Sequence, residues 1–165
     1  MILNHLMPYF SGFMLIIVSG FAGSGKSTLA DKLGKQFGLP VVHASHLLQQ
    51  LKSKQAQELD TSNTKAGSGW WESKEAQDYM KQRQKDSSMD KALDKELLSI
   101  AEKGNVVLDS WTMPWLCKNG IKVWLNAKAE TRAKRVSERD NLKYKDVLKK
   151  IKDRDKKTAA IYKKI

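Results

Sequence analysis

Apolar and polar positions alternate along the chain in two recurring patterns. Four short, continuous apolar runs have the length and composition of parallel strands buried on both faces. Between and after these runs lie longer segments whose apolar residues recur every three or four positions, as on one face of a helix. Because strands and helices alternate, we predict an α/β fold with right-handed crossovers and a parallel sheet covered on both faces. The four runs are residues 13–19, 40–44, 105–109 and 121–127.

The helical segments are predicted from their periodicity and from the residues at their ends. Gly38 is expected to end the first helix, and Gly104 is expected to end the fourth. Ser45 is expected to cap the second helix at its N-terminus. The polar stretch 60–69 is expected to form a hinge-like loop. The six predicted helices are, approximately, residues 26–37, 45–59, 70–86, 87–103, 129–140 and 144–163.

Length and composition are those of a single globular domain. The 165 residues can bury one ordinary core, and 41% hydrophobic with 29% charged residues is typical of a folded, soluble chain. The first 13 residues are apolar but hold no lysine or arginine, unlike a signal peptide, and we expect an N-terminal extension before a domain at 14–165. No apolar run reaches the ~18 residues of a membrane span. We therefore expect a cytoplasmic monomer without a membrane partner.

The segment after the first apolar run, GFAGSGKST, has the spacing of a phosphate-binding loop. Gly20, Gly25, Lys26 and Ser27 satisfy the pattern G-x-x-x-x-G-K-[ST], and a predicted strand and helix flank it as this motif requires. The glycines let successive backbone N–H groups turn toward phosphate oxygens, and the helix adds its positive dipole end. The residues expected to bind the phosphates of a nucleotide cofactor are Gly20, Ala22, Gly23, Ser24, Gly25, Lys26, Ser27 and Thr28.

Two oxygen-bearing side chains are expected to position a metal ion at this loop. The Ser27 hydroxyl can ligate Mg²⁺ directly. Asp109 ends the third apolar run, which is a usual place for the acidic group that orients the metal and its waters. Ser27 and Asp109 are therefore the predicted metal residues.

The formal net charge of +12 is concentrated toward the C-terminus, where residues 127–165 hold 15 lysines and arginines and six acidic residues. Such a charge suits phosphorylated small molecules, a nucleic acid or a membrane surface, and charge alone does not choose among them. Arg132, Arg135 and Arg139 are spaced to lie on one helical face. Phosphoryl transfer needs positive charge around its transition state. The residues predicted to be catalytic are Lys26, Arg135, Arg139 and Arg154.

These motifs together resemble the nucleoside monophosphate kinases, and most of all the cytidylate kinases of archaeal type. The resemblance is carried by the phosphate loop, by DKALDKELLSIAEKGNVVLD, by KVWLNAKAETRAKRVSERD and more weakly by RDKKTAAIYKKI. It implies ATP with Mg²⁺ as the donor and CMP or dCMP as the acceptor. It also implies the three-layer P-loop kinase fold, with an acceptor-binding helical segment at about 45–88 and a lid at about 132–154. The family's fifth strand has no counterpart before Ile165, so four strands are expected.

The sequence departs from the family pattern on the acceptor side. Gln49 stands where such kinases carry an arginine, Ser110-Trp111 stands where they carry Gly-Arg, and Ile161 also replaces an arginine. Several tryptophans could instead form a stacking wall for a base. His43 and His46 flank the second strand, and we assign them no role. The tryptophans in question are Trp70, Trp71, Trp111 and Trp115.

Two alternatives therefore stay open beside phosphoryl transfer to a nucleoside monophosphate. In the first, the donor half is the same and the acceptor is a different small molecule that carries a hydroxyl or phosphate group. In the second, the chain is an ATP-binding module that contacts RNA through its basic C-terminal helices. Single-stranded RNA sites usually add aromatic side chains to basic ones, and this segment offers only Tyr144 and Tyr162.

Overall fold

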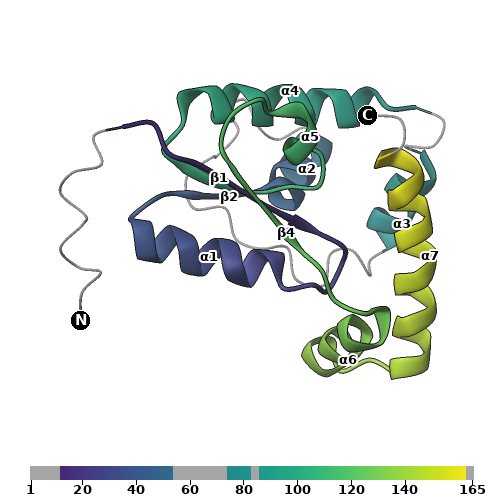
Figure 1. The fold of residues 1–165 in the computed structure, drawn as a ribbon. Coiled ribbons are helices and arrows are strands. Elements are labelled where there is room, and N and C mark those ends of the chain that lie inside the picture. The colour runs from purple at the N-terminus through teal and green to yellow at the C-terminus, as the bar shows by residue number, and fades with distance from the viewer. Residues whose placement is uncertain (1–11, 54–73, 83–85, 163–165) are drawn as a thin grey trace, which may run out of the picture.

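The computed structural model describes residues 12–53, 74–82 and 86–162. Within them the strands form one four-stranded parallel sheet in the order β2-β3-β1-β4 (Figure 1). Strand and helix alternate as the apolar pattern predicts, so the α/β fold class with four strands is confirmed. The strands are β1 (Leu15–Gly20), β2 (Val41–His43), β3 (Val106–Asp109) and β4 (Ile121–Leu125).

Helices cover both faces of this sheet, which gives three layers (Figure 1). On one face lies α1, and on the other lie α2, α4 and the short α5. Helices α3, α6 and α7 lie beyond the carboxyl end of β1 (Figure 1). The bounds are α1 Lys26–Phe37, α2 Ala44–Ser53, α3 Lys74–Gln82, α4 Ser88–Lys103, α5 Met113–Leu116, α6 Ala129–Asp140 and α7 Tyr144–Tyr162.

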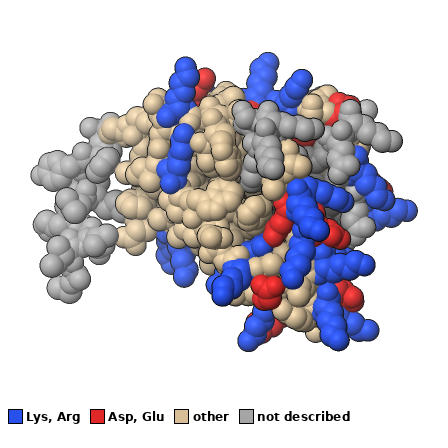
Figure 2. Space-filling view, turned by 45° about the vertical axis from the view of Figure 1, so that its right-hand side comes forward, with Lys and Arg blue, Asp and Glu red and all other residues tan. Residues whose placement is uncertain are grey.

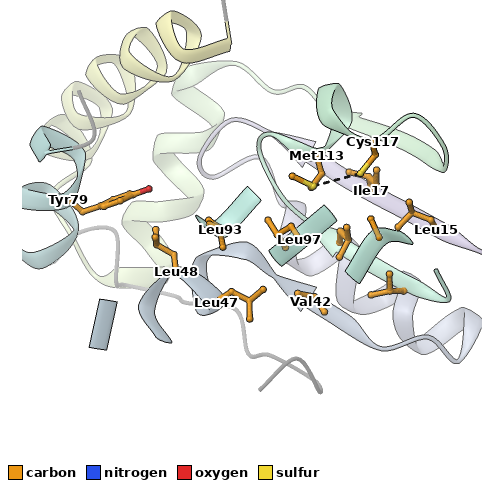
Figure 3. Packing of buried hydrophobic residues seen from close by; sticks show 13 residues of the cluster. Leu15, Ile17, Val42, Leu47, Leu48, Tyr79, Leu93, Leu97, Met113 and Cys117 are labelled. Atoms are coloured by element: carbon orange, nitrogen blue, oxygen red, sulfur yellow. Dashed lines mark hydrogen bonds between the residues drawn. The ribbon is translucent and has the colours of Figure 1, made fainter. Parts of the chain in front are cut away.

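Two apolar clusters follow from the alternation of side chains along the strands. Ile16 and Val18 of β1 face α1, where they pack with Ala30. Ile17 faces the other way into a larger cluster that includes Leu97 of α4 and extends to Tyr79 of α3 (Figure 3). Both faces of β1 are thus fully covered, as expected of a continuous apolar run in the middle of a parallel sheet.

Helices α6 and α7 share a separate small core of Ala133, Val136, Val147 and Ile151. Their outer surfaces carry many lysines and arginines with acidic residues among them (Figure 2). Arg132 and Arg135 of this helix pair donate hydrogen bonds to the loop between β1 and α1, as described below.

Several local expectations need correction. Helix α2 begins at Ala44, so Ser45 lies inside the helix rather than at its cap. Helix α5 was not predicted, because its four residues are too few for a periodic pattern and its Pro114 reads as a breaker; proline is tolerated there because it lies in the first helical turn. The predicted loop at 60–69 lies outside the described residues. Among the described helices, none is both long and apolar enough to cross a membrane.

Candidate active site

The glycine-rich loop connects the end of β1 to the start of α1, at the carboxyl edge of the sheet. Two of its glycines are required by close backbone approaches. A Cβ on Gly20 would lie 2.4 Å from the Leu125 carbonyl oxygen, and one on Gly23 would lie 3.0 Å from the Arg132 carbonyl oxygen. Gly25 has open space around it, but its φ of 99° disfavours any other residue. The loop is therefore held tightly between β4, α6 and α1.

Lys26 begins α1, and its ammonium donates a hydrogen bond back to the Phe21 carbonyl oxygen at 3.3 Å. Burial lowers the pKa of Lys26 from its usual value, and the charges of Arg154 and Arg132 lower it further, against the opposing charge of Asp109. Lys26 is thus one of several cations collected around the loop, and an anionic ligand such as a phosphate would relieve their repulsion.

Ser27 and Asp109 are brought together as predicted. The Ser27 hydroxyl donates to Asp109 Oδ2 at 2.6 Å, and the carboxylate is only 6% exposed. Burial by itself would raise the pKa of Asp109. The hydrogen bonds from His43 and Ser27 and the charge of Lys26 outweigh it and lower the pKa below its usual value. Asp109 is therefore a carboxylate near neutral pH.

His43 also belongs to this site, although the sequence analysis assigned it no role. It ends β2 directly beside Asp109 at the end of β3, because the two are register partners in the sheet. Its Nδ1 lies 2.9 Å from Asp109 Oδ2 and its Nε2 lies 3.0 Å from Asp31 Oδ1. Burial lowers the pKa of His43, but the two carboxylates outweigh it and raise the pKa above its usual value. The sequence signal that could have identified His43 is its place at the carboxyl end of a predicted parallel strand.

The arginines of α6 do not share one role. Arg132 is buried and ties the helix to its surroundings, because it donates to the carbonyl oxygens of Ala22 and Ala127 and pairs with Asp155 of α7 at 2.5 Å. Arg135 donates to the Ser24 carbonyl oxygen at 3.2 Å, which keeps it against the loop. Arg132 therefore clamps the loop and α7 together, while Arg135 lies on the loop surface.

The two remaining predicted arginines, Arg139 and Arg154, have other partners. Arg139 is half-exposed and pairs with its neighbour Asp140 at 2.5 Å. Arg154 of α7 stacks on Trp111, with its guanidinium carbon 4.6 Å from the ring centroid. Trp111 thus contacts α7. Trp115 contacts Trp124 of β4 instead, and Trp70 and Trp71 lie outside the described residues.

A cavity of about 530 Å³, within the usual size range of small-molecule sites, connects these groups. The predicted residues that line it are Ala22, Gly23, Lys26, Ser27, Thr28, Asp109, Arg139 and Arg154. Four others, namely Gly20, Ser24, Gly25 and Arg135, lie in or against the loop but do not line the cavity. The cavity continues away from the loop along α2, α3 and α4.

The wall on that far side is rich in side-chain oxygens. Tyr79 donates from its hydroxyl to Asp90, and Thr112 donates to Asp94 at 2.5 Å. All four of these residues line the cavity. Gln49 does not line it, and its side-chain amide donates to the Ser45 carbonyl oxygen one turn back in the same helix.

The residues at the loop fit a magnesium ion in the chemistry of their donors. Mg²⁺ prefers oxygen ligands and is usually held by one or two protein groups together with phosphate oxygens and water. The Ser27 hydroxyl and the Asp109 carboxylate offer such oxygens on the cavity wall. The described residues hold no group of three or more His, Cys, Asp or Glu that could bind a metal without help from a ligand.

Comparison with known proteins identifies the family. A model of the cytidylate kinase-like family matches residues 15–165. The cytidylate kinase of Sulfurisphaera tokodaii is 32% identical over 145 residues, which cover 86% of this chain and 71% of that protein. The cytidylate kinase of Pyrococcus horikoshii is 28% identical over 143 residues, which cover 86% of this chain and 66% of that protein. This chain therefore spans about two thirds of the length of these relatives.

Solved structures support the fold independently. The shikimate kinase of Bacteroides thetaiotaomicron superimposes with a TM-score of 0.60 at 16% identity, covering 93% of this chain and 83% of that one. At this identity the likeness shows a shared kinase fold and nothing about the acceptor. The family match, by contrast, includes the nucleotide loop, Asp109 and the arginines of α6 and α7 in one alignment of nearly the whole chain. By that match the chain belongs to the cytidylate kinase-like family.

Proposed function

We propose that this protein transfers the γ-phosphoryl group of ATP to a nucleoside monophosphate, with CMP or dCMP as the preferred acceptor. The observation that carries the proposal is a cavity lined both by Lys26, Ser27 and Asp109 and by hydrogen-bonding side chains of α3 and α4. A donor and an acceptor held in one cavity can meet in line, which is the main requirement of phosphoryl transfer.

The donor end supplies charge where the transfer needs it. In the proposed mechanism Lys26 contacts the β- and γ-phosphates of ATP, and the loop N–H groups hold the phosphate oxygens. Arg135, Arg139 and Arg154 surround the transferring group from α6 and α7, the proposed lid at about 132–154. No side chain has to act as a strong base, because positioning and charge stabilisation provide most of the rate enhancement in such reactions.

Ser27 and Asp109 would hold Mg²⁺ directly or through water. When bound there, the ion would supply positive charge that offsets part of the negative charge of the phosphates. Asp109 contributes a negatively charged oxygen, and Ser27 contributes a neutral one at the start of the helix that follows the loop.

The acceptor end is proposed to lie along the segment at about 45–88 and the start of α4. Asp90 and Asp94 line the cavity there, and carboxylate oxygens accept hydrogen bonds from an exocyclic amino group such as that of cytosine. Uracil presents a carbonyl oxygen at the same position, which a carboxylate would repel. This complementarity, together with the names of the relatives, favours CMP over UMP.

The test is an ADP-release assay of the purified protein with Mg-ATP and CMP, dCMP, UMP or AMP in parallel, with the phosphorylated product identified by chromatography. The expected result is formation of CDP or dCDP above the rate with UMP and AMP. If none of the four acceptors supports ADP release above the acceptor-free rate, the proposed function is wrong.

A second candidate keeps the same donor chemistry with a different small acceptor. It is favoured by Gln49, whose amide is bonded to its own helix rather than directed into the cavity, and by Trp111, which stacks on Arg154. The acceptor wall then offers carboxylates and hydroxyls, which suit an uncharged, hydroxyl-rich molecule better than a phosphate. ADP release with a polyol or sugar, and none with a nucleotide, would identify this function.

A further inference from the structure

His43 is a deeply buried polar side chain in contact with the candidate site. It is 1% exposed, and each ring nitrogen lies within hydrogen-bonding distance of a carboxylate oxygen. One of these carboxylates, Asp109, is buried, whereas Asp31 is 58% exposed and lines the cavity. The ring thus connects a residue on the cavity wall to the acidic residue beside the nucleotide loop.

The contacts at Asp109 restrict how its carboxylate can turn. His43 Nδ1 and the Ser27 hydroxyl both meet the same oxygen, Oδ2, at 2.9 and 2.6 Å. Two bonds to one oxygen from opposite elements, β2 and α1, fix the rotation of the group about its last side-chain bond. The outer partners of a metal site act in this way, because they set the orientation and basicity of the groups that face the metal.

We propose that His43 is a positioning residue that holds the Asp109 carboxylate in the orientation needed to bind a magnesium-nucleotide complex, and that Asp31 in turn holds the imidazole ring. This inference rests on the proposed function only in assuming that the loop binds a nucleotide together with a divalent cation. It does not depend on the identity of the acceptor. Neither His43 nor Asp31 was among the residues predicted from the sequence motifs.

A purely structural role for His43 makes a different prediction. A buried imidazole has to be hydrogen-bonded to be tolerated, and the two carboxylates would satisfy it. On that reading any substitution of His43 lowers stability, and the affinity for nucleotide is affected equally with and without Mg²⁺. The positioning role predicts an effect that appears only when Mg²⁺ is present.

Two substitutions of similar size separate the readings. In His43→Asn the side-chain nitrogen lies near the position of Nδ1, so it can still donate to Asp109 but cannot reach Asp31. In His43→Gln the nitrogen lies near the position of Nε2, so it can reach Asp31 but not Asp109. Both variants keep a polar group in the same buried space, and both are expected to lose some stability.

The measurement is the affinity for ADP by titration calorimetry, with excess Mg²⁺ and with a chelator instead. For the unmodified protein, Mg²⁺ is expected to tighten ADP binding. We expect His43→Gln to lose about 10-fold of this tightening, the lower end of the usual effect of an outer partner, and His43→Asn to keep most of it. Binding in the chelator should stay the same in all three proteins.

Two further variants complete the design. Asp31→Asn, which weakens the hold on the ring, is expected to lose less of the tightening than His43→Gln. His46→Asn replaces a histidine of α2 that does not line the cavity, and this variant is expected to behave like the unmodified protein. Equal losses in His43→Asn and His43→Gln, or full tightening in His43→Gln, would overturn the proposal.

The binding readout also separates this inference from the proposed function. If no acceptor is phosphorylated but His43→Gln selectively loses the Mg²⁺-dependent tightening, the proposed acceptor chemistry fails and the positioning role stands. If the unmodified protein binds ADP equally well with and without Mg²⁺, the positioning role is wrong, whatever the transfer assay gives.

Discussion

The two ends of the cavity differ in how far along the chain their hydrogen bonds reach. At the nucleotide loop, Ser27 bonds to Asp109, 82 residues away, and Arg135 bonds to Ser24, 111 residues away. On the acceptor wall, Tyr79 bonds to Asp90 and Thr112 bonds to Asp94, over 11 and 18 residues. The loop end is therefore pre-organised by contacts between distant parts of the chain, whereas the bonds of the acceptor wall join segments that are closer in sequence.

The charged groups differ as well. At the loop end the cations Lys26 and Arg154 lie close to the carboxylate of Asp109, whereas Asp90 and Asp94 line the cavity from α4. A phosphate chain fits the cations of the first set regardless of the molecule that carries it. The second set can be read by several acceptors with amino or hydroxyl groups. The comparison teaches that the donor is determined by many mutually supporting contacts, while the choice of acceptor depends on a few side chains.

The largest expected effect is on the donor end. Replacing Lys26 by alanine removes the cation proposed to contact the β- and γ-phosphates, and the rate should fall by at least about 100-fold, the usual loss for one preorganised charge-stabilising group. The measurement is ADP release at saturating ATP and acceptor. Lys32→Ala, an exposed lysine farther along the same helix, is the matched control and should keep full activity.

The next effect concerns the clamp that joins α6 and α7 to the loop. Arg132→Ala leaves Asp155 without its buried partner and removes two bonds to backbone carbonyls. We expect a loss of about 3 kcal/mol in the free energy of unfolding, measured in urea. Lys152→Ala is the control, because Lys152 pairs with Glu130 across the same two helices at the surface and exposed pairs contribute little. A similar loss in both variants would contradict the clamp.

The acceptor end can be tested by restoring the family's arginine. Gln49→Arg is expected to lower the KM for CMP by about 10-fold, because a charge-assisted bond to phosphate is worth ~1.5 kcal/mol or more, and to leave the KM for ATP unchanged. Gln50→Arg, one position further round the helix, is the control. No change in the KM for CMP would show that the acceptor phosphate lies elsewhere and would favour the second candidate function.

The sequence was informative wherever a motif determines local geometry. The loop pattern predicts a strand, a turn and a helix in a fixed order, and the rule that parallel strands end at one edge of the sheet predicts that Asp109 approaches Ser27. The sequence could not indicate which arginine of α6 is buried, because the spacing of Arg132, Arg135 and Arg139 places all three on one helical face. That choice depends on where α7 packs, and Asp155 is 23 residues away from Arg132 along the chain.

The contact of His43 with Asp109 could not be predicted from the sequence either. This contact requires that β2 lies next to β3 in the sheet, and three residues of strand carry no information about their neighbours. Once the order β2-β3-β1-β4 is known, the register brings the last residues of β2 and β3 side by side. Strand order, rather than strand identity, was the missing information.

The smallest expected effect is a pH dependence of the free energy of unfolding that arises from His43 and Asp109. The pKa of His43 is raised in the folded protein, chiefly through Asp109 and Asp31 acting against burial. The stability it contributes is therefore fully present below the unfolded pKa of 6.5 and is lost as the pH rises through the folded value. Asp109 has a lowered pKa, so its contribution is present above 3.8 and is lost as the pH falls through its folded value.

The measurement is the free energy of unfolding of the nucleotide-free protein and of His43→Asn, in urea, between pH 5.5 and pH 9. The advantage of the unmodified protein should be greatest near pH 6 and should shrink as the pH rises, by no more than about 1.4 kcal/mol per pH unit, since one proton is involved. An advantage that stays constant or grows over this range would mean that the carboxylates of Asp31 and Asp109 do not stabilise the charged ring. The long-range contacts at the loop end would then depend on Ser27 and the arginines, and the charge of His43 in β2 would contribute nothing to stability.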